Sequence, residues 1–499
     1  MSDGAAQRRL ARAWALLIAC SALYFLADNE ADNDLWMHLF SGRHILAAGA
    51  VPRFDDASYT AAGLPWIDHE WLTQVLFAWT FAHGGSTALW LLKLTVALFT
   101  AWLVWLPLAR QARNWWARGP VMVLALATLS RGYAVRPQIV TMLGIAALLA
   151  WLERADARLR RRALFVVAAA FVIWSNAHGA VVVGLGILAL YALDGLRPGL
   201  ASGLSAPARV VLLGVAVVAV CATPYGADLF WYVARELQAP HPLSEWQPVS
   251  LVDPAQRTFL IMLAALIATL PFARLLRRER WWAVLVGGLA VVALRQQRHT
   301  PLFALCAAAP LADQCDAALD WAAKRTRFQF SDAAQSVLAC AIGAFAVVQL
   351  ALLGGRLVRD RAELVFDAAD YPVGAVRYIA ANGLRGNLAL PLDWGGYALW
   401  HLAPNVAVSL DGRFATVYPP AVVEDGFAFF RGDGGSGAAR LLDAYPTSLV
   451  LVPRYTQTPL DGRAEWRPLY ADEISTLYGR DGVAAAAPSS AARGRLAFP

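Results

Sequence analysis

The chain has 499 residues, of which 58% are hydrophobic and only 16% charged, and this composition excludes an ordinary soluble domain. The formal charge of +7 does not indicate nucleic-acid binding, because most of the arginines lie between apolar runs, where they fit a role in membrane topology. The five cysteines are scattered, which excludes a disulfide framework and zinc-finger spacing. We therefore expect a protein that crosses a bilayer many times and has no nucleic-acid partner.

The first apolar run, "QRRLARAWALLIACSALYFLA", has a basic lead and nearly the length needed to span a hydrocarbon core of about 30 Å. It lacks a clear small-residue cleavage site, so we expect a retained signal anchor. Eleven transmembrane helices in all are predicted, although several runs are short and must be extended by flanking polar residues. The further apolar runs are 86–109, 119–130, 138–152, 163–175, 180–193, 209–222, 258–273, 281–294, 301–312 and 336–354.

The loop after the first span mixes charged side chains with large apolar ones in "ADNDLWMHLFSGRHILAAGAVPRFDD". This mixture predicts a short amphipathic helix from Asp34 to about Leu46, lying on the membrane surface. Arginines are in excess in alternate loops, which predicts that this loop lies on the outer face of the membrane. Other polar stretches fall on the same side: "WIDHEWL", "SRGYAVRPQ", "WSNAHG", "LSEWQP" and "RQQRHTP". Charge near a bilayer is costly, so these stretches indicate a site at the outer face.

After residue 354 the chain changes character. Strand-like runs "NLALPL", "VAVSL" and "SLVLV" alternate with helical stretches such as "PVGAVRYIAANG", which predicts a small α/β domain. The segments "DWGGYALWHLAP" and "LDGRFATVYPP" look rich in turns. We expect a polytopic α-helical membrane domain over residues 1–354, with its first outer loop at 28–71. An extracytoplasmic α/β domain is expected over residues 355–499, because the span count is odd.

The order of these features resembles the GT-C glycosyltransferase superfamily. The wording "DNDLWMHLFSGRHILAAGAVPRFDDASYT", then "PWIDHEWL", "RPQ", "NAHG", "TPYG" and "GGYALWHLAPNVAVSLDGR", is similar to bacterial membrane proteins related to the dolichyl-phosphate-mannose protein mannosyltransferases. The resemblance implies transfer of a sugar from a polyprenyl-phosphate carrier to a lipid, glycan or protein acceptor. A carboxylate of the first loop would act as general base. Asp34 is the first choice and Asp32 the second, because this loop reads Asp-Asn-Asp where many GT-C enzymes have adjacent acids.

The resemblance also implies residues that bind the substrates. The outer-face arginines are candidates for the carrier phosphate, because planar guanidinium groups suit it. The predicted substrate-binding residues are His38, His69, Glu70, Arg131, Arg136, His178, Arg295, Arg298 and His299. No cofactor is assigned. The acids and histidines of the first loop could hold a divalent metal ion, but oxygen-rich interfacial loops are too common to be specific.

Structural roles compete with each of these assignments. Asp34 could be a helix cap, Asp32 a solvated loop acid and His38 a surface imidazole. His69 and Glu70 could anchor the next helix, the arginines could snorkel at helix ends, and His178 could make an interhelical hydrogen bond. Two other classes of protein stay open: a transporter, and a non-catalytic membrane component of polysaccharide assembly or export. The sequence lacks the internal repeats typical of transporters.

Overall fold

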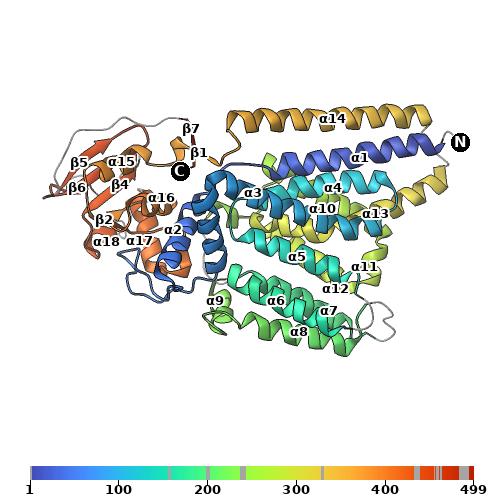
Figure 1. Ribbon diagram of the computed structural model, residues 1–499, viewed down its shortest axis with the longest axis horizontal. Helices are drawn as coiled ribbons and strands as arrows, with labels where there is room; N and C mark the ends of the chain where they lie inside the picture. The colour runs from blue at the N-terminus through green and yellow to red at the C-terminus, as the bar shows by residue number, and fades with distance from the viewer. Residues whose placement is uncertain are drawn as a thin grey trace. The chain divides into compact units, whose positions relative to one another are not determined.

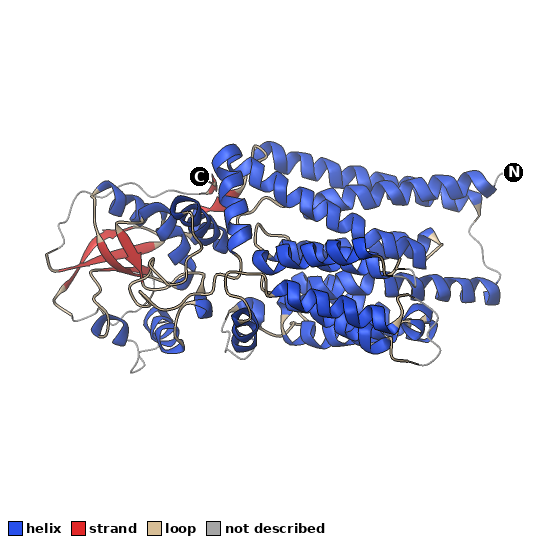
Figure 2. Ribbon diagram, turned by 60° about the horizontal axis from the view of Figure 1, so that its bottom comes forward, coloured by secondary structure: helices blue, strands red, loops and turns tan. Residues whose placement is uncertain are grey.

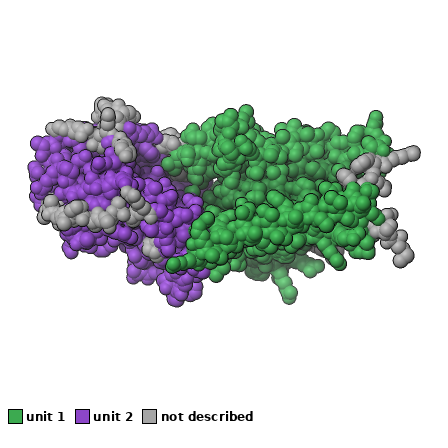
Figure 3. Space-filling model, turned by 90° about the horizontal axis from the view of Figure 1, so that it is seen from above, with its two compact units in different colours: residues 1–28, 90–223, 240–362 green, residues 29–89, 224–239, 363–499 purple. Residues whose placement is uncertain are grey.

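The computed structural model describes residues 3–155, 159–197, 203–236, 243–326, 331–431, 439–454, 456, 460, 463–482 and 494–498. The chain divides into two compact units, which Figure 3 colours separately. Unit 1 comprises residues 1–28, 90–223 and 240–362. Unit 2 comprises residues 29–89, 224–239 and 363–499, so that the loop after the first helix belongs to the same unit as the C-terminal part of the chain.

Unit 1 consists of helices (Figures 1 and 2). Its α-helices are α1 (Asp3–Leu26), the part of α3 (Trp71–Gln111) from Trp90 onward, α4 (Trp115–Leu129), α5 (Gln138–Leu152), α6 (Arg161–Ala177), α7 (Val181–Asp194), α8 (Ala206–Val220), α10 (Arg257–Ala268), α11 (Arg274–Arg278), α12 (Arg280–Arg295), α13 (Thr300–Thr326) and α14 (Asp332–Arg359). Its short 3₁₀ helices are η1 (Ser130–Gly132), η2 (Ser244–Trp246), η3 (Pro254–Gln256), η4 (Leu270–Phe272) and η5 (Gln297–His299).

The predicted apolar runs all overlap helices of unit 1, which confirms a mainly helical protein with apolar helices. Within the described part of the chain, four helical segments are long and apolar enough to cross a membrane: Ala5–Leu26, Trp71–Gln111, Gln297–Thr326 and Asp332–Arg359. The shorter apolar helices match the runs that looked short in the sequence. The count of eleven crossings therefore stays a prediction.

Helix α1 packs along both α14 and α4, and α4 packs on α13 (Figure 1). A buried hydrogen bond links α1 to α14, where the hydroxyl of Ser21 donates to Oε1 of Gln349 at 2.9 Å. Between apolar helices such a bond is favourable, because either polar group alone would lose its partner in hydrocarbon. Gly119 of α4 lets the ring of Trp14 approach closely, since a Cβ there would lie 2.2 Å from a ring atom.

Unit 2 contains a five-stranded sheet with the order β3-β2-β4-β6-β5 and a two-stranded sheet of β1 and β7 (Figure 2). Strands β3, β2 and β4 are parallel, whereas β4, β6 and β5 are antiparallel; Leu388 lies opposite both Val408 and Leu449. The strands are β1 (Val365–Asp367), β2 (Gly386–Ala389), β3 (Val406–Val408), β4 (Leu449–Pro453), β5 (Trp466–Ala471), β6 (Ser475–Arg480) and β7 (Arg495–Ala497). The predicted strands of the α/β region are confirmed as β2, β3 and β4.

The helices of unit 2 surround this sheet and the first loop. They are α2 (Asn33–Ala48), the part of α3 up to Leu89, α9 (Asp228–Glu236), α15 (Val373–Ala381), α16 (Leu392–Leu402), α17 (Pro420–Arg431) and α18 (Arg440–Asp443), with 3₁₀ turns η6 (Ala368–Asp370) and η7 (Phe414–Thr416). The expected helix after the first span is confirmed as α2, whereas its place on the membrane surface stays a prediction. Its first half is more buried than an amphipathic surface helix would be, since Leu35 through Leu39 are all buried.

Helix α16 corrects the expectation that "DWGGYALWHLAP" is rich in turns. Two glycines normally disfavour a helix, by about 1 kcal/mol each. Here they permit close packing, because a Cβ on Gly395 would lie 2.0 Å from the carbonyl oxygen of Leu410, and one on Gly396 would lie 3.2 Å from the backbone nitrogen of Met37. The glycines of this segment thus bring α16 against α2 and against the chain that follows β3.

Candidate functional site

The two acids of the first loop have different places at the N-terminus of α2. Asp32 is the N-cap residue: its backbone is extended (φ −78°, ψ 149°), and its carboxylate accepts the backbone N–H of Asp34 at 3.0 Å. Aspartate is a favoured cap because its oxygen satisfies one of the N–H groups that have no partner within the helix. Asp34 lies in the first turn and is half-buried. The capping role that competed with a chemical role for Asp34 therefore belongs to Asp32.

Residues of the C-terminal part of unit 2 hold this end of α2. The N–H of Ala31 donates to the carbonyl of Val365 at 2.8 Å, and the N–H of Val365 donates to Asn29 at 2.9 Å, so that the chain before α2 runs parallel to β1. The hydroxyl of Tyr371 donates to Oδ1 of Asn33. The backbone that carries Asp34 is thus fixed on both sides of the cap.

The carboxylate of Asp34 lies against Gly412. A Cβ built on Gly412 would be 2.9 Å from Oδ1 of Asp34, which is closer than real Cβ contacts. Gly396 stands in a similar relation to Met37, one turn further along α2. The first loop, the Gly-Gly-Tyr segment and the Asp-Gly-Arg segment, on which the resemblance was most specific, therefore meet at one place in unit 2.

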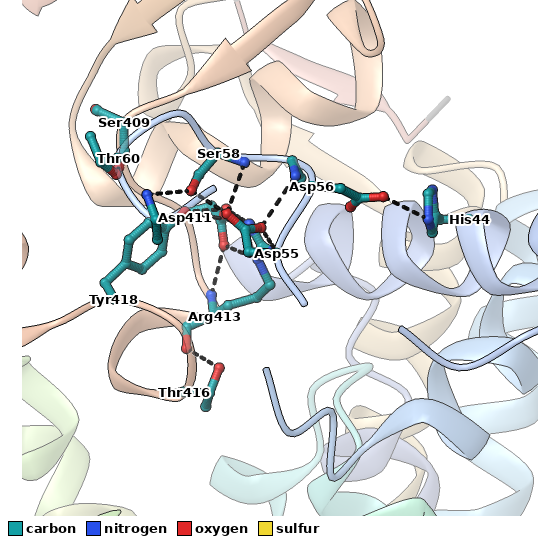
Figure 4. Close-up of polar contacts among 12 residues, drawn as sticks. His44, Asp55, Asp56, Ser58, Thr60, Ser409, Asp411, Arg413, Thr416 and Tyr418 are labelled. Carbon is teal, nitrogen blue, oxygen red and sulfur yellow. Dashed lines mark hydrogen bonds and ion pairs between the residues drawn. The ribbon is translucent and has the colours of Figure 1, made fainter. Parts of the chain in front are cut away.

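Asp411 and Arg413, on either side of Gly412, belong to a buried ion-pair network (Figure 4). The guanidinium of Arg413 donates to both oxygens of Asp411, at 2.9 and 2.7 Å, and to Oδ1 of Asp55 at 2.6 Å. The hydroxyl of Tyr418 donates to Asp411 at 2.6 Å. Burial alone would raise the pKa of Asp411, but the adjacent Arg413 holds that pKa below its ordinary value. The arginine of the Asp-Gly-Arg segment is therefore committed to holding the fold.

The same network attaches the first loop to the five-stranded sheet. Asp55 accepts hydrogen bonds from the backbone N–H groups of Ala57 and Ser58, each at 3.2 Å, and from the Ser58 hydroxyl. Ser58 pairs in parallel with Val408 at the free edge of β3, and the hydroxyl of Thr60 donates to Ser409 (Figure 4). The loop thus covers an edge that would otherwise expose unpaired backbone groups.

Asp68 is a buried carboxyl group in the "WIDHEWL" segment, only 2% exposed. Its Oδ1 accepts from the side-chain amide of Gln74 at 3.0 Å and from the N–H of Glu70 at 3.3 Å. Its backbone N–H donates to the hydroxyl of Tyr225 at 3.0 Å. Burial raises the pKa of Asp68 to about 7, and the nearby Glu70 adds to this, although His69 acts in the opposite direction. Asp68 is therefore built to hold its proton near neutral pH.

His38, His69 and Glu70 lie close together in unit 2. The two oxygens of Glu70 lie 3.8 Å from Nδ1 of His38 and 3.5 Å from Nε2 of His69. His38 is buried one helical turn after Asp34, on the same face of α2. The ring of His69 also packs on Tyr232 of α9, with ring centroids 4.8 Å apart. The expectation that His38 is a surface imidazole is therefore wrong.

In unit 1, two of the predicted arginines share one carboxylate. Arg136 and Arg298 each place a guanidinium nitrogen 3.2 Å from an oxygen of Glu245. Burial alone would raise the pKa of Glu245, but the two arginines hold that pKa below its ordinary value. The guanidinium of Arg298 also lies 4.1 Å from the ring centre of Trp246. Arg136 and Glu245 thus join the polar stretches "SRGYAVRPQ" and "LSEWQP" in one ion-pair cluster.

The other predicted residues of unit 1 lie apart from this ion pair or have structural contacts. Arg131 donates to the carbonyl of Ala255 at 2.5 Å, and Arg295 is exposed at the end of α12. His299 is hydrogen-bonded to Oε1 of Gln296 at 2.9 Å. Nδ1 of His178 lies 2.7 Å from the hydroxyl of Thr141, which is the interhelical hydrogen bond that competes with a role in substrate binding.

Comparison with known proteins gives matches at the level of structure. No family model and no curated protein matches the sequence. The chain is similar to the oligosaccharyltransferase AglB from Archaeoglobus fulgidus, solved in complex with an inhibitory peptide and a dolichol-phosphate; the TM-score is 0.55 at 11% identity, over 88% of this chain and 69% of that one. It is also similar to ArnT from Cupriavidus metallidurans bound to undecaprenyl phosphate, with a TM-score of 0.54 at 13% identity over 95% of this chain and 98% of that one. Both are GT-C membrane glycosyltransferases.

This chain has the GT-C fold. The resemblance stated from the sequence is confirmed at that level. A third match, the apo form of the Archaeoglobus fulgidus oligosaccharyltransferase, has a TM-score of 0.56 at 12% identity and covers 95% of this chain. Identities this low establish the fold, whereas the reaction and the residues that carry it have to be argued from the site.

A metal ion would require a cluster of ligating side chains. Among the residues that the structure describes, no group of three or more His, Cys, Asp or Glu side chains is arranged to hold a metal ion. The divalent ion considered for the first loop therefore has no assigned site.

Sequence reasoning missed four residues around the predicted site of this GT-C fold: Asp55, Asp68, Asp411 and Arg413. Asp68 lies in a quoted motif, yet its burial depends on Gln74 and on Tyr225, which is 157 residues away. The Asp411–Arg413 pair at i and i+2 was a usable signal, because opposite charges two residues apart can form a local ion pair, as they do here. Glu245 was missed as well, although its segment was recognised as polar.

Proposed function

We propose that the chain is a membrane glycosyltransferase that transfers a sugar from a polyprenyl-phosphate carrier to an acceptor hydroxyl. The general kind of reaction is supported by the GT-C fold and by neighbours that are glycosyltransferases of lipid-linked sugars. One observation carries the assignment of Asp34. Asp32 is the N-cap residue of α2. Asp34 lies in the first turn of α2, and its carboxylate lies beside Gly412.

In this reaction Asp34 is the general base. The acceptor oxygen forms a bond to the anomeric carbon as the bond from that carbon to the carrier phosphate breaks. The electron pair of the broken bond remains on the phosphate oxygen, and the acceptor proton goes to the Asp34 carboxylate. Asp32 is a poorer base, since one of its oxygens is occupied by the N–H of Asp34.

The remaining predicted residues bind the substrates in this proposal. His38, His69 and Glu70 form a polar group on the side of α2 that carries Asp34, and they suit hydroxyl groups of a sugar or an acceptor. Arg136 and Arg298 suit the carrier phosphate, because planar guanidinium groups match the geometry of phosphate oxygens. Arg131, Arg295, His178 and His299 are the further proposed contacts.

The proposed location is the bacterial cytoplasmic membrane, with unit 2 on the outer side. Apolar helices and membrane-protein neighbours support a multi-pass protein. Reporter fusions after Arg361 test the side: an enzyme that is active only outside the cytoplasm should be active there. A fusion that instead activates a cytoplasm-only reporter would place the C-terminal region inside.

The experiment that tests the function starts from the lipids. Membranes of cells that lack the chain should accumulate a polyprenyl-phosphate-linked sugar, identified by mass spectrometry. The purified chain in nanodiscs should then release undecaprenyl phosphate from a panel of undecaprenyl-phosphate hexoses when an acceptor extract is added. Asp34→Asn should abolish this release while the protein stays folded. A transporter or an assembly component would release no undecaprenyl phosphate, and Asp34→Asn would leave its effect on the lipid pool unchanged.

A further inference from the structure

We infer that Gly412 is a positioning residue for the Asp34 carboxylate: its missing side chain leaves the space in which that carboxylate lies, and the Asp411–Arg413 ion pair keeps the space fixed. This inference rests on the proposed function, because it supposes that the position of Asp34 matters for transfer. It adds a residue of the C-terminal region to the machinery of the first loop.

The backbone of Gly412 does not explain why the residue is glycine. Nine glycines of the described chain have a φ in the left-handed region, where other residues are strained, and Gly412 is not one of them. A side chain at position 412 would meet Oδ1 of Asp34 at 2.9 Å, Cγ of Asp34 at 3.8 Å and Cβ of Met37 at 3.9 Å. Position 412 therefore suits glycine because Oδ1 of Asp34, the proposed base, lies close to where a Cβ would be.

The segment around Gly412 has little freedom to move away. Asp411 and Arg413 are buried, and four hydrogen bonds from Arg413 and Tyr418 converge on the Asp411 carboxylate. Arg413 is held in turn by Asp55, and the hydroxyl of Thr416 donates to the Arg413 carbonyl at 2.5 Å. A methyl group at position 412 would thus be carried by a rigid segment.

The backbone of Asp34 has equally little freedom. Its N–H is held by the Asp32 carboxylate, and the preceding residues pair with β1 through Ala31 and Val365. The carboxylate is the end of a short flexible side chain, so it is the part that must yield to an added Cβ. A displacement of about 1 Å in a reacting group can cost about 100-fold in rate.

The test uses the full chain in nanodiscs, with undecaprenyl-phosphate hexose as donor and release of undecaprenyl phosphate as the readout. Gly412→Ala should lower the rate 10-fold or more with a small change in thermal unfolding midpoint. Gly374→Ala is the control for a steric clash elsewhere in unit 2, because its Cβ would meet the hydroxyl of Tyr470 at 2.1 Å and Oδ2 of Asp472 at 2.5 Å. That variant displaces other side chains than Asp34 and should keep the wild-type rate.

A double-mutant comparison separates positioning from a general loss of structure. If Gly412 acts through Asp34, the double variant Asp34→Asn, Gly412→Ala should be no slower than Asp34→Asn alone. Should Gly412→Ala fail to fold, Asp34→Glu tests the same idea, since it keeps the acid but moves it by one methylene. A loss of 10-fold or more in Asp34→Glu supports positioning.

Two results would overturn the inference and leave the proposed function standing: a wild-type rate in Gly412→Ala, or a wild-type rate in Asp34→Glu, while Asp34→Asn is inactive. A double variant slower than Asp34→Asn would also overturn it, because Gly412 would then act independently of the base. A wild-type rate in Asp34→Asn is a different outcome. It would refute the general-base role of Asp34 in the proposed function, and this inference with it.

Discussion

The carboxylate of Asp32 accepts the backbone N–H of Asp34 at 3.0 Å, so that two acids only two residues apart divide two tasks between them. Asp32 caps the N-terminus of α2. Asp34, in the first turn, is also in a place where the helix dipole favours a negative charge. The division predicts that the two positions respond differently to the same substitution.

Asp34→Asn should lower sugar transfer by about 10²- to 10⁴-fold, the usual cost of losing a general base, with little change in stability. Asp32→Asn should cost much less activity, because asparagine is as good a cap as aspartate. Asp32→Ala should lower the stability of the fold by about 1 kcal/mol. Release of undecaprenyl phosphate and thermal unfolding of the same preparations measure both effects. Loss of transfer in Asp32→Asn with full transfer in Asp34→Asn would move the base to Asp32.

Arg413→Met should destabilise unit 2 strongly, by about 3–5 kcal/mol, because it leaves the buried Asp55 and Asp411 without their cation. The control is Arg463→Met, which removes an exposed partner of Asp443 at 2.8 Å. Exposed pairs contribute about 0–1 kcal/mol, so this control should unfold like the wild type. Limited proteolysis and thermal unfolding report the difference. Equal stability of the two variants would show that the buried network is dispensable.

Glu245→Gln should tighten the binding of undecaprenyl phosphate, because Glu245 competes with the phosphate for Arg136 and Arg298. Arg298→Gln should weaken the binding by about 1.5–3 kcal/mol, the value of a lost hydrogen bond to a charged group. The same loss is expected for the exposed Arg295. Arg257→Gln, at the exposed start of α10, serves as the control. Unchanged affinity in the Glu245 and Arg298 variants would make this ion pair purely structural.

Asp68 predicts a pH dependence of stability. Burial raises the pKa of Asp68 from 3.8 to about 7, so between these values the folded chain holds a proton that the unfolded chain has released. Stability from this group is therefore complete below about pH 4 and is lost as the pH rises to 7. The loss amounts to several kcal/mol, since each tenfold change in proton affinity is worth about 1.4 kcal/mol.

The measurement is the thermal unfolding midpoint of the full chain in detergent, at pH 5 and at pH 8. Asp68→Asn should be more stable than the wild type at pH 8, and by a smaller margin at pH 5, because asparagine keeps the acceptor for Gln74 and needs no proton. Asp56→Asn changes a half-exposed carboxylate that pairs with His44 at 3.1 Å, and it should not separate from the wild type in this way. A constant difference between Asp68→Asn and wild type at both values of pH would contradict the prediction.

Much of the fold could be predicted from the sequence, because local patterns carry it. Apolar runs identify the helices of unit 1, and alternation of strands and helices identifies β2, β3, β4 and α15. The pattern failed where packing overrides propensity: Gly395 and Gly396 suggested turns, but they lie in α16 because their neighbours need the space. The β5–β6 hairpin was not predicted, since Pro468 within it weakens the strand pattern.

The candidate site was harder to predict, because its contacts join distant parts of the chain. The histidines and Glu70 lie in recognisable motifs, and they do meet. Nothing local in the sequence shows that Asp55 binds Arg413, 358 residues further on, or that Asp34 faces Gly412. Chemistry-bearing residue types can be found by inspection, but which of them share a space depends on the tertiary fold.

The attachment of the first loop to β3 has a consequence for the order of events during synthesis. The ribosome makes residues 29–89 early, yet Asp55 has to wait for Arg413, and at about 5–20 residues per second this delay is roughly 20 to 70 s. Until then Asp55 lacks its contact with Arg413. Any product that terminates before Gly412 lacks both the edge that the loop covers and the neighbour of Asp34. Sugar transfer should therefore begin only when nearly the whole chain has been made, and prematurely terminated chains should have no transfer activity.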